Sequence, residues 1–122
     1  MADKWQAQFN FWSRFNLPVY ERDSVPDRED ISYPYITYEA ASSGFDEDVP
    51  VSASVWTRGE SWVTADYYAD QIYGVLANGG VTVGYDTGMI WITPGVPFAE
   101  SMGDPDDDMI KRKLLSVTLR FS

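Results

Sequence analysis

The carboxylates between residues 104 and 108 are the side chains of this sequence with the most evident chemical potential. Ca²⁺ and Mg²⁺ prefer hard oxygen ligands, and such ligands are supplied here by Asp104, Asp106, Asp107 and Asp108. An EF-hand loop counted from Asp104 would need Gly at the position of Met109 and Glu at its last position, and the chain has neither. We therefore interpret the segment as a solvated acidic loop and predict no metal site. A metal site and an acidic docking surface are the alternatives.

Other residues that serve catalysis are sparse. The chain has no Cys and no His, which excludes disulfides, thiol nucleophiles and zinc fingers and removes the commonest general base near neutral pH. Its 19 acidic residues would bring two carboxylates together by chance, so a pair of them is no signal for glycoside hydrolysis. Gly79, Gly80 and Gly84 are too sparse for a phosphate-binding loop. We predict that the protein is not an enzyme and needs no cofactor.

The net charge of −10 argues against a nucleic-acid-binding role, because affinity for phosphates comes mainly from Lys and Arg. An acidic surface would let DNA pass close by without sticking. No apolar run has the length of a membrane span, and the N-terminal residues lack the pattern of a signal peptide. We expect a protein that is made and kept in a cytoplasm unless it leaves as part of an assembly.

Two helices are expected to position these side chains. The first covers residues 3–15, with Asp3 as its N-cap, and it ends before Pro18. The second covers residues 61–77 and ends at Gly79-Gly80. The expected apolar rows are Trp5, Phe9 and Trp12, then Phe11 and Phe15 beside them, in the first helix, and Trp62, Ala65, Ala69, Ile72, Tyr73 and Leu76 in the second.

The strands are expected at 33–40, 51–56, 81–85, 89–93 and 109–121, with a polar connection at 18–32 and an acidic turn at 42–50. Pro34 should mark the start or an edge of its strand. In the last strand the residues expected to face the core are Leu115, Val117, Leu119 and Phe121.

The order α-β-β-α-β-β-β predicts an α+β fold with a single, mostly antiparallel or mixed sheet of about five strands and both helices packed on one face. Residues 1–122 should form one domain.

Exposed rings are the other candidates for function, because Trp and Tyr anchor many protein interfaces. Trp56, Trp91 and Phe98 are the candidates. Trp56 shares a strand face with serines, so it lies either outside the core or beneath a loop or helix. Residues 94–108 read as a long loop that carries Phe98 and Met102, and a loop of that length in a small domain is usually functional or disordered.

A set of short segments follows in order along most of the chain: Trp5-Gln6-Ala7 with Phe11-Trp12, the strand from Tyr33 to Tyr38, Ser61-Trp62, Gly79-Gly80, the segment from Ile90 to Ala99, and the segment from Met102 to Arg112. Through these segments the sequence resembles the small tail-completion proteins of long-tailed bacteriophages, the tail terminator or head–tail joining class.

The resemblance implies a structural protein of the virion tail, made in the cytoplasm of the host bacterium. Such proteins form a ring, typically a hexamer, that caps the tail tube protein, ends its polymerisation and joins the tail to the head connector or stopper protein. DNA would leave through the central hole without specific binding. A ring built head to tail needs two different complementary patches on each subunit. No catalytic residue, cofactor or membrane is implied.

The expected sites are therefore interfaces. The partner-binding loop is predicted to act through Phe98, Met102, Asp104, Asp106, Asp107 and Asp108. Tyr33, Tyr35 and Trp56 are the second choice, as contacts between neighbouring subunits. A neck adaptor, a stopper or a minor capsid protein is the alternative in the same class. A carbohydrate-binding module that uses exposed Trp rings as sugar platforms is the alternative from another class.

Overall fold

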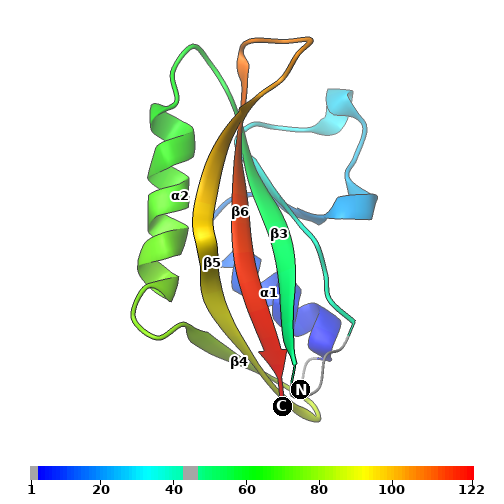
Figure 1. The fold of residues 1–122 in the computed structure, drawn as a ribbon. Coiled ribbons are helices and arrows are strands. Elements are labelled where there is room, and N and C mark those ends of the chain that lie inside the picture. Colours follow the sequence, from blue (N-terminus) through cyan, green and yellow to red (C-terminus); the bar gives the residue numbers. More distant parts are fainter. Residues whose placement is uncertain (1–2, 43–46) are drawn as a thin grey trace.

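Two helices lie against one face of a six-stranded sheet in the computed structural model of the protein, which describes residues 3–42 and 47–122 (Figure 1). The strands cross the sheet in the order β1-β2-β3-β6-β5-β4, and neighbours are antiparallel except for the parallel pair β1 and β2. The prediction of an α+β fold with one mixed sheet is confirmed, with six strands in place of about five. The strands are β1 (Val19–Glu21), β2 (Tyr35–Tyr38), β3 (Asp48–Arg58), β4 (Val81–Tyr85), β5 (Gly88–Gly103) and β6 (Ile110–Phe121).

Helix α1 (Lys4–Ser13) begins where the sequence predicts, because the Asp3 carboxylate accepts a hydrogen bond of 2.8 Å from the backbone N–H of Gln6. The expected packing face is only partly right, since Trp5 and Phe9 are exposed. The face of α1 that packs on the sheet is rotated from the expected one. Its buried residues are Ala7, Gln8, Phe11 and Trp12.

The reason for this rotation of α1 is a polar contact that hydropathy does not record. The side-chain amide of Gln8 donates to the carbonyl of Ala41 and accepts from its N–H, both at 2.9 Å. Two buried backbone groups beside β2 are satisfied in this way, and leaving them unpaired would cost stability. The ring of Phe15 continues the Phe11 row as expected, with the two centroids 5.9 Å apart.

Helix α2 (Val63–Leu76) packs through the predicted stripe, of which Ala65, Ala69, Ile72 and Leu76 are buried. Tyr73 is exposed at the flank of the stripe, because the two alanines bring the helix close to the sheet along a narrower line. The helix ends as expected, with the N–H of Gly80 donating to the carbonyl of Leu76 at 3.0 Å. Gly79 and Gly80 both have positive φ.

The connection expected at 18–32 contains a strand that the sequence does not predict. β1 pairs in parallel with β2, with Val19 beside Ile36, and two 3₁₀ turns follow at Arg22–Ser24 and Arg28–Asp30. Three residues are too few to show an alternating pattern. As expected, Pro34 directly precedes the strand β2. The acidic turn expected at 42–50 falls partly on residues 43–46, which lie outside the described residues, and β3 already begins at Asp48.

The long loop predicted at 94–108 is wrong for most of its length. β5 continues to Gly103 and pairs with β6 from Ala99, opposite Leu115, to the end of the strand. The register shifts between Pro94 and Ala99, and this irregularity accommodates the two prolines that make the sequence look like a loop.

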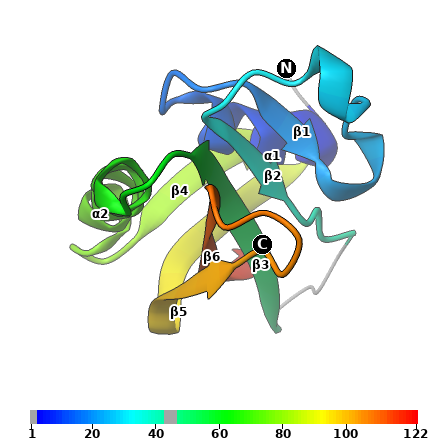
Figure 2. The ribbon, with the colours of Figure 1, turned by 90° about the horizontal axis from the view of Figure 1, so that it is seen from above.

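The core lies between the helices and the middle of the sheet, and Figure 2 shows both helices on the same side of β3, β5 and β6. β6 contributes the four residues that the sequence predicts, Leu115, Val117, Leu119 and Phe121, all buried. Among the described residues, neither α1 nor α2 lies on the opposite face of the sheet, and we call it the helix-free face.

Candidate functional site

Pairing between strands places four large side chains in one row across the helix-free face. Tyr35 of β2 lies opposite Trp56 of β3, Trp56 lies opposite Arg112 of β6, and Arg112 lies opposite Met102 of β5. Their neighbours along each strand point to the core, because side chains alternate between the two faces of a sheet. We call these four residues the aromatic–arginine row.

The row is held by contacts on both sides of Trp56. Its ring is nearly parallel to that of Tyr35, at an angle of 8° with the centroids 6.0 Å apart. The Arg112 guanidinium lies 4.8 Å from the indole centroid, in a cation–π contact. The indole Nε1 also donates to Thr37 Oγ1 at 2.9 Å. Because neighbours on both flanking strands contact this ring, Trp56 does not present the free face that a sugar platform needs.

A hollow of about 180 Å³ opens beside the row, between the sheet and the connection that follows β1. Its lining includes Arg22, Val25, Ser54, Trp56 and Arg112. Pockets for small molecules usually enclose about 300–1,000 Å³. This hollow is therefore better matched to one or two side chains of a protein partner than to a metabolite.

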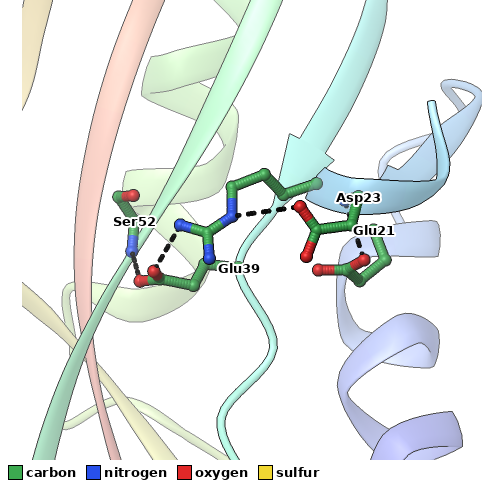
Figure 3. Close-up of polar contacts among 5 residues, drawn as sticks. Glu21, Asp23, Glu39 and Ser52 are labelled. Atoms are coloured by element: carbon green, nitrogen blue, oxygen red, sulfur yellow. Dashed lines mark hydrogen bonds and ion pairs between the residues drawn. The ribbon is translucent and has the colours of Figure 1, made fainter.

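Glu39 fixes the wall of the hollow, as Figure 3 shows. One carboxylate oxygen of Glu39 accepts from Arg22 Nη1 at 2.7 Å, and the other accepts from the backbone N–H of Ser52 at 3.2 Å. The Glu21 carboxylate accepts from the backbone N–H of Asp23 at 2.8 Å. The connection after β1 is thus tied to β3 through Glu39 at the wall of the hollow.

Arg112 is half-buried and has no carboxylate partner. Its Nε donates to Ser54 Oγ at 2.9 Å, but it forms no ion pair with any acidic residue in the described parts of the chain. The other arginines of the sheet do, since Arg58 pairs with Asp107 and Arg120 with Asp48. Arg112 also borders a second, smaller hollow with Met102 and Asp104.

The acidic segment is a short, ordered loop that spans only the turn from β5 to β6. The Asp104 carboxylate accepts from the N–H of Asp106 at 2.8 Å, and the Asp107 carboxylate accepts from the N–H of Met109 at 3.0 Å. The Asp107 carboxylate also pairs with Arg58, and this hydrogen bond raises the pKa of the Arg58 guanidinium. Asp106 and Asp108 are exposed, and neither forms an ion pair with a cation that the structure describes. In residues 3–42 and 47–122, no group of three or more acidic side chains could hold a metal ion.

The structure separates the predicted interface residues. Phe98 is wrong as a projecting loop residue, because it lies in β5, half-buried against the core, with its ring 5.1 Å from that of Tyr73. Met102 is 39% exposed. Tyr35 is 6% exposed and so serves to support the row more than to touch a partner. The ring of Tyr33 lies 5.3 Å from it and is half-buried.

Sequence reasoning missed Arg112 of this surface and the exposed Val96 elsewhere on β5. Arg112 lies in the run Lys111-Arg112-Lys113. Only the alternation along the final strand could have shown that Arg112 lies on the other face of the sheet from the two lysines. Val96 is 99% exposed at the irregularity of β5. Pro94 and Pro97 on either side of it make the segment look like a loop, so its place in a strand is not evident from the sequence. Trp91, a sequence candidate, is exposed, and its indole Nε1 donates to the carbonyl of Gly79 at 2.8 Å.

One contact between a serine and a lysine has the composition of a catalytic pair. Lys113 Nζ donates to Ser101 Oγ at 2.9 Å and to the Asp66 carboxylate at 2.6 Å. Lys113 is the donor in both contacts, and the three side chains come from β6, β5 and α2. The arrangement is therefore suited to holding α2 on the sheet.

Neither helix in the described part of the chain is long and apolar enough to cross a membrane. In comparisons with known protein families, curated proteins and solved structures, the chain matches none of them. The function must therefore be argued from the surfaces described above.

Proposed function

We propose that this chain is a structural protein of a bacteriophage tail, the subunit of a ring that caps the tail tube, ends its polymerisation and joins the tail to the head connector. The observation that carries the proposal is the aromatic–arginine row beside a side-chain-sized hollow on the helix-free face. The sequence resemblance to tail-completion proteins supplies the identity of the partners.

The row has the chemistry of a protein interface. Trp, Tyr and Arg dominate the binding energy of many interfaces, above all where they are pre-positioned around a pocket. Trp56 and Arg112 are fixed by their neighbours before any partner arrives, so little side-chain entropy is lost on binding. Met102 extends the same row with an exposed, flexible apolar side chain.

The molecule also offers a second, different surface, which a head-to-tail ring requires. On α2, Val63 and Tyr67 are exposed, and Trp5 and Phe9 are exposed on α1. These helices lie together on one side of the sheet (Figure 2), and the alternation along the strands turns the row to the other side. A subunit with unlike apolar surfaces on two sides can contact two neighbours, or a neighbour and the tube.

The charges support a lumen that DNA crosses without tight binding. Four basic side chains are already paired with carboxylates of the same chain, namely Arg22, Arg58, Lys113 and Arg120. Acidic residues outnumber basic ones by 19 to 9, and the resulting net charge of −10 repels phosphates.

The proposal is tested by following the growth of tail tubes from the tube protein of the same phage by light scattering. Substoichiometric amounts of this chain should stop growth at a lower plateau, because each ring removes one growing end. The variant Asp86→Ala, which changes an exposed carboxylate in the turn between β4 and β5, away from the row and the hollow, is the matched control and should stop growth equally well. Unchanged growth together with binding to isolated heads would favour a neck adaptor or stopper instead.

A further inference from the structure

We propose that the hollow on the helix-free face receives the acidic loop, residues 104–108, of a second copy of this chain, with Asp106 and Asp108 pairing with Arg112. The inference rests on the self-association in the proposed function and names the residues that would carry it.

The first argument is charge complementarity. Arg112 is the half-buried cation of the row, and it has no acidic partner in the parts of the chain that the structure describes. Asp106 and Asp108 are exposed carboxylates that likewise pair with no described cation. Bidentate pairing of Arg with a carboxylate is among the stronger polar contacts in proteins. A second copy brings both unpaired partners together, which the contacts within one copy do not.

The second argument is size and shape. A hollow of about 180 Å³ admits one or two small side chains, and Asp is among the smaller charged ones. The loop is narrow, because it only joins β5 to β6, and it stands at the end of the sheet where β3 ends and α2 begins (Figure 1). Its tip can therefore enter a neighbour without moving the core.

The third argument is preorganisation. The Asp104 and Asp107 carboxylates hold the loop through backbone N–H groups, and Arg58 ties Asp107 to β3. On the receiving side, Glu39 holds the wall of the hollow. Since both surfaces are ordered before contact, docking loses little conformational entropy. Asp104 and Asp107 are engaged in these internal bonds, so Asp106 and Asp108 are the carboxylates available to a neighbour.

The loop and the hollow are different surfaces, so one-way docking is a heterologous contact, whereas a reciprocal exchange of loops would give a two-fold dimer. A copy whose loop is docked still has an open hollow, and the next copy can add there. Contacts of this kind close into a ring or continue as a filament, depending on the rotation between copies.

Charge reversal gives a direct test, in solution and without tail tubes. Self-association of the full chain is measured by analytical ultracentrifugation up to millimolar concentration. Arg112→Glu alone, and Asp106→Arg with Asp108→Arg in one chain, should each lower the association constant on the order of 100-fold. An equimolar mixture of the two variants should restore it, because each loop then meets a hollow of opposite charge.

Controls separate docking from folding. Arg120→Glu reverses another arginine of the same sheet face and should leave association unchanged, since its exposed pair with Asp48 contributes little. Thermal melts should show that all variants fold. The inference is overturned if the wild-type chain remains monomeric, if Arg112→Glu associates normally, or if the mixture shows no recovery. Each of these results can occur while the chain still stops tube growth, so this test and the test of the proposed function fail separately.

Discussion

Phe98 and Met102 lie four residues apart in β5 and have opposite surroundings. The Phe98 ring packs against Tyr73 and the core, whereas Met102 stands at the exposed end of the aromatic–arginine row. From the sequence the two residues form one apolar tip of a loop. The strand that holds them packs one against the core and leaves the other exposed.

Substitution of the two residues should therefore separate these roles. Phe98→Ser should lower the free energy of unfolding by about 2 kcal/mol, because a half-buried ring is lost and a hydroxyl takes its place. Met102→Ser should leave the free energy of unfolding nearly unchanged but weaken binding to the tube or to a second copy. Urea unfolding followed by Trp fluorescence measures the first effect. Equal losses of stability in both variants would show that Met102 belongs to the core.

The acidic residues show how much of the site the sequence alone can predict. Asp104 to Asp108 are recognisable as a solvated loop, and the structure keeps them in one. The unpaired state of Arg112 could not be predicted, because it depends on which carboxylates reach each arginine across the sheet. Asp107 and Asp48 lie far from Arg58 and Arg120 in sequence, and only strand register brings them together.

At the scale of elements, two glycines in and after α2 have contrasting surroundings. Gly74 lies on the exposed side of α2, and a Cβ built there meets no atom within 4 Å. Gly80 has φ of +80°, and its Cβ would collide with the carbonyl oxygen of Ile92 and lie 2.8 Å from the Thr93 methyl group. A side chain can therefore be accommodated at Gly74 but not at Gly80.

The same substitution should have opposite effects at the two positions. Gly74→Ala should raise the free energy of unfolding by up to about 1 kcal/mol, because Ala restricts the unfolded chain and favours the helix. Gly80→Ala should lower it by more than about 2 kcal/mol through strain at positive φ and the clash with β5. Thermal and urea unfolding measure both changes. A neutral Gly80→Ala would mean that the turn between α2 and β4 is not built as described.

Element prediction succeeded where one pattern dominates and failed where two compete. Helix α2 and strand β6 have regular apolar spacing and were found. In β5, Pro94 and Pro97 outweigh the strand pattern that follows, because local signals cannot show that β6 offers a partner on the far side of the irregularity. In α1, Gln8 is buried and bonded to Ala41, whereas the larger rings of Trp5 and Phe9 are exposed. Hydropathy alone predicts the reverse.

For the whole molecule, the arrangement of unlike surfaces is the main consequence of the fold. Helices cover one side of the sheet and leave the other side to the row, the hollow and the loop at the end of β5 and β6 (Figure 1). This asymmetry suits a subunit that must contact different partners on different sides. In the proposed assembly, the acidic balance would keep DNA from adhering.

Electron microscopy of purified tail tubes mixed with this chain tests the central claim most directly. We predict a ring at one end of each tube in samples with the wild-type chain, and bare ends with Arg112→Glu at the same concentration. Arg120→Glu should form rings like the wild type. Wild-type samples whose tubes stay bare at both ends, and still lengthen when tube protein is added, would contradict the account.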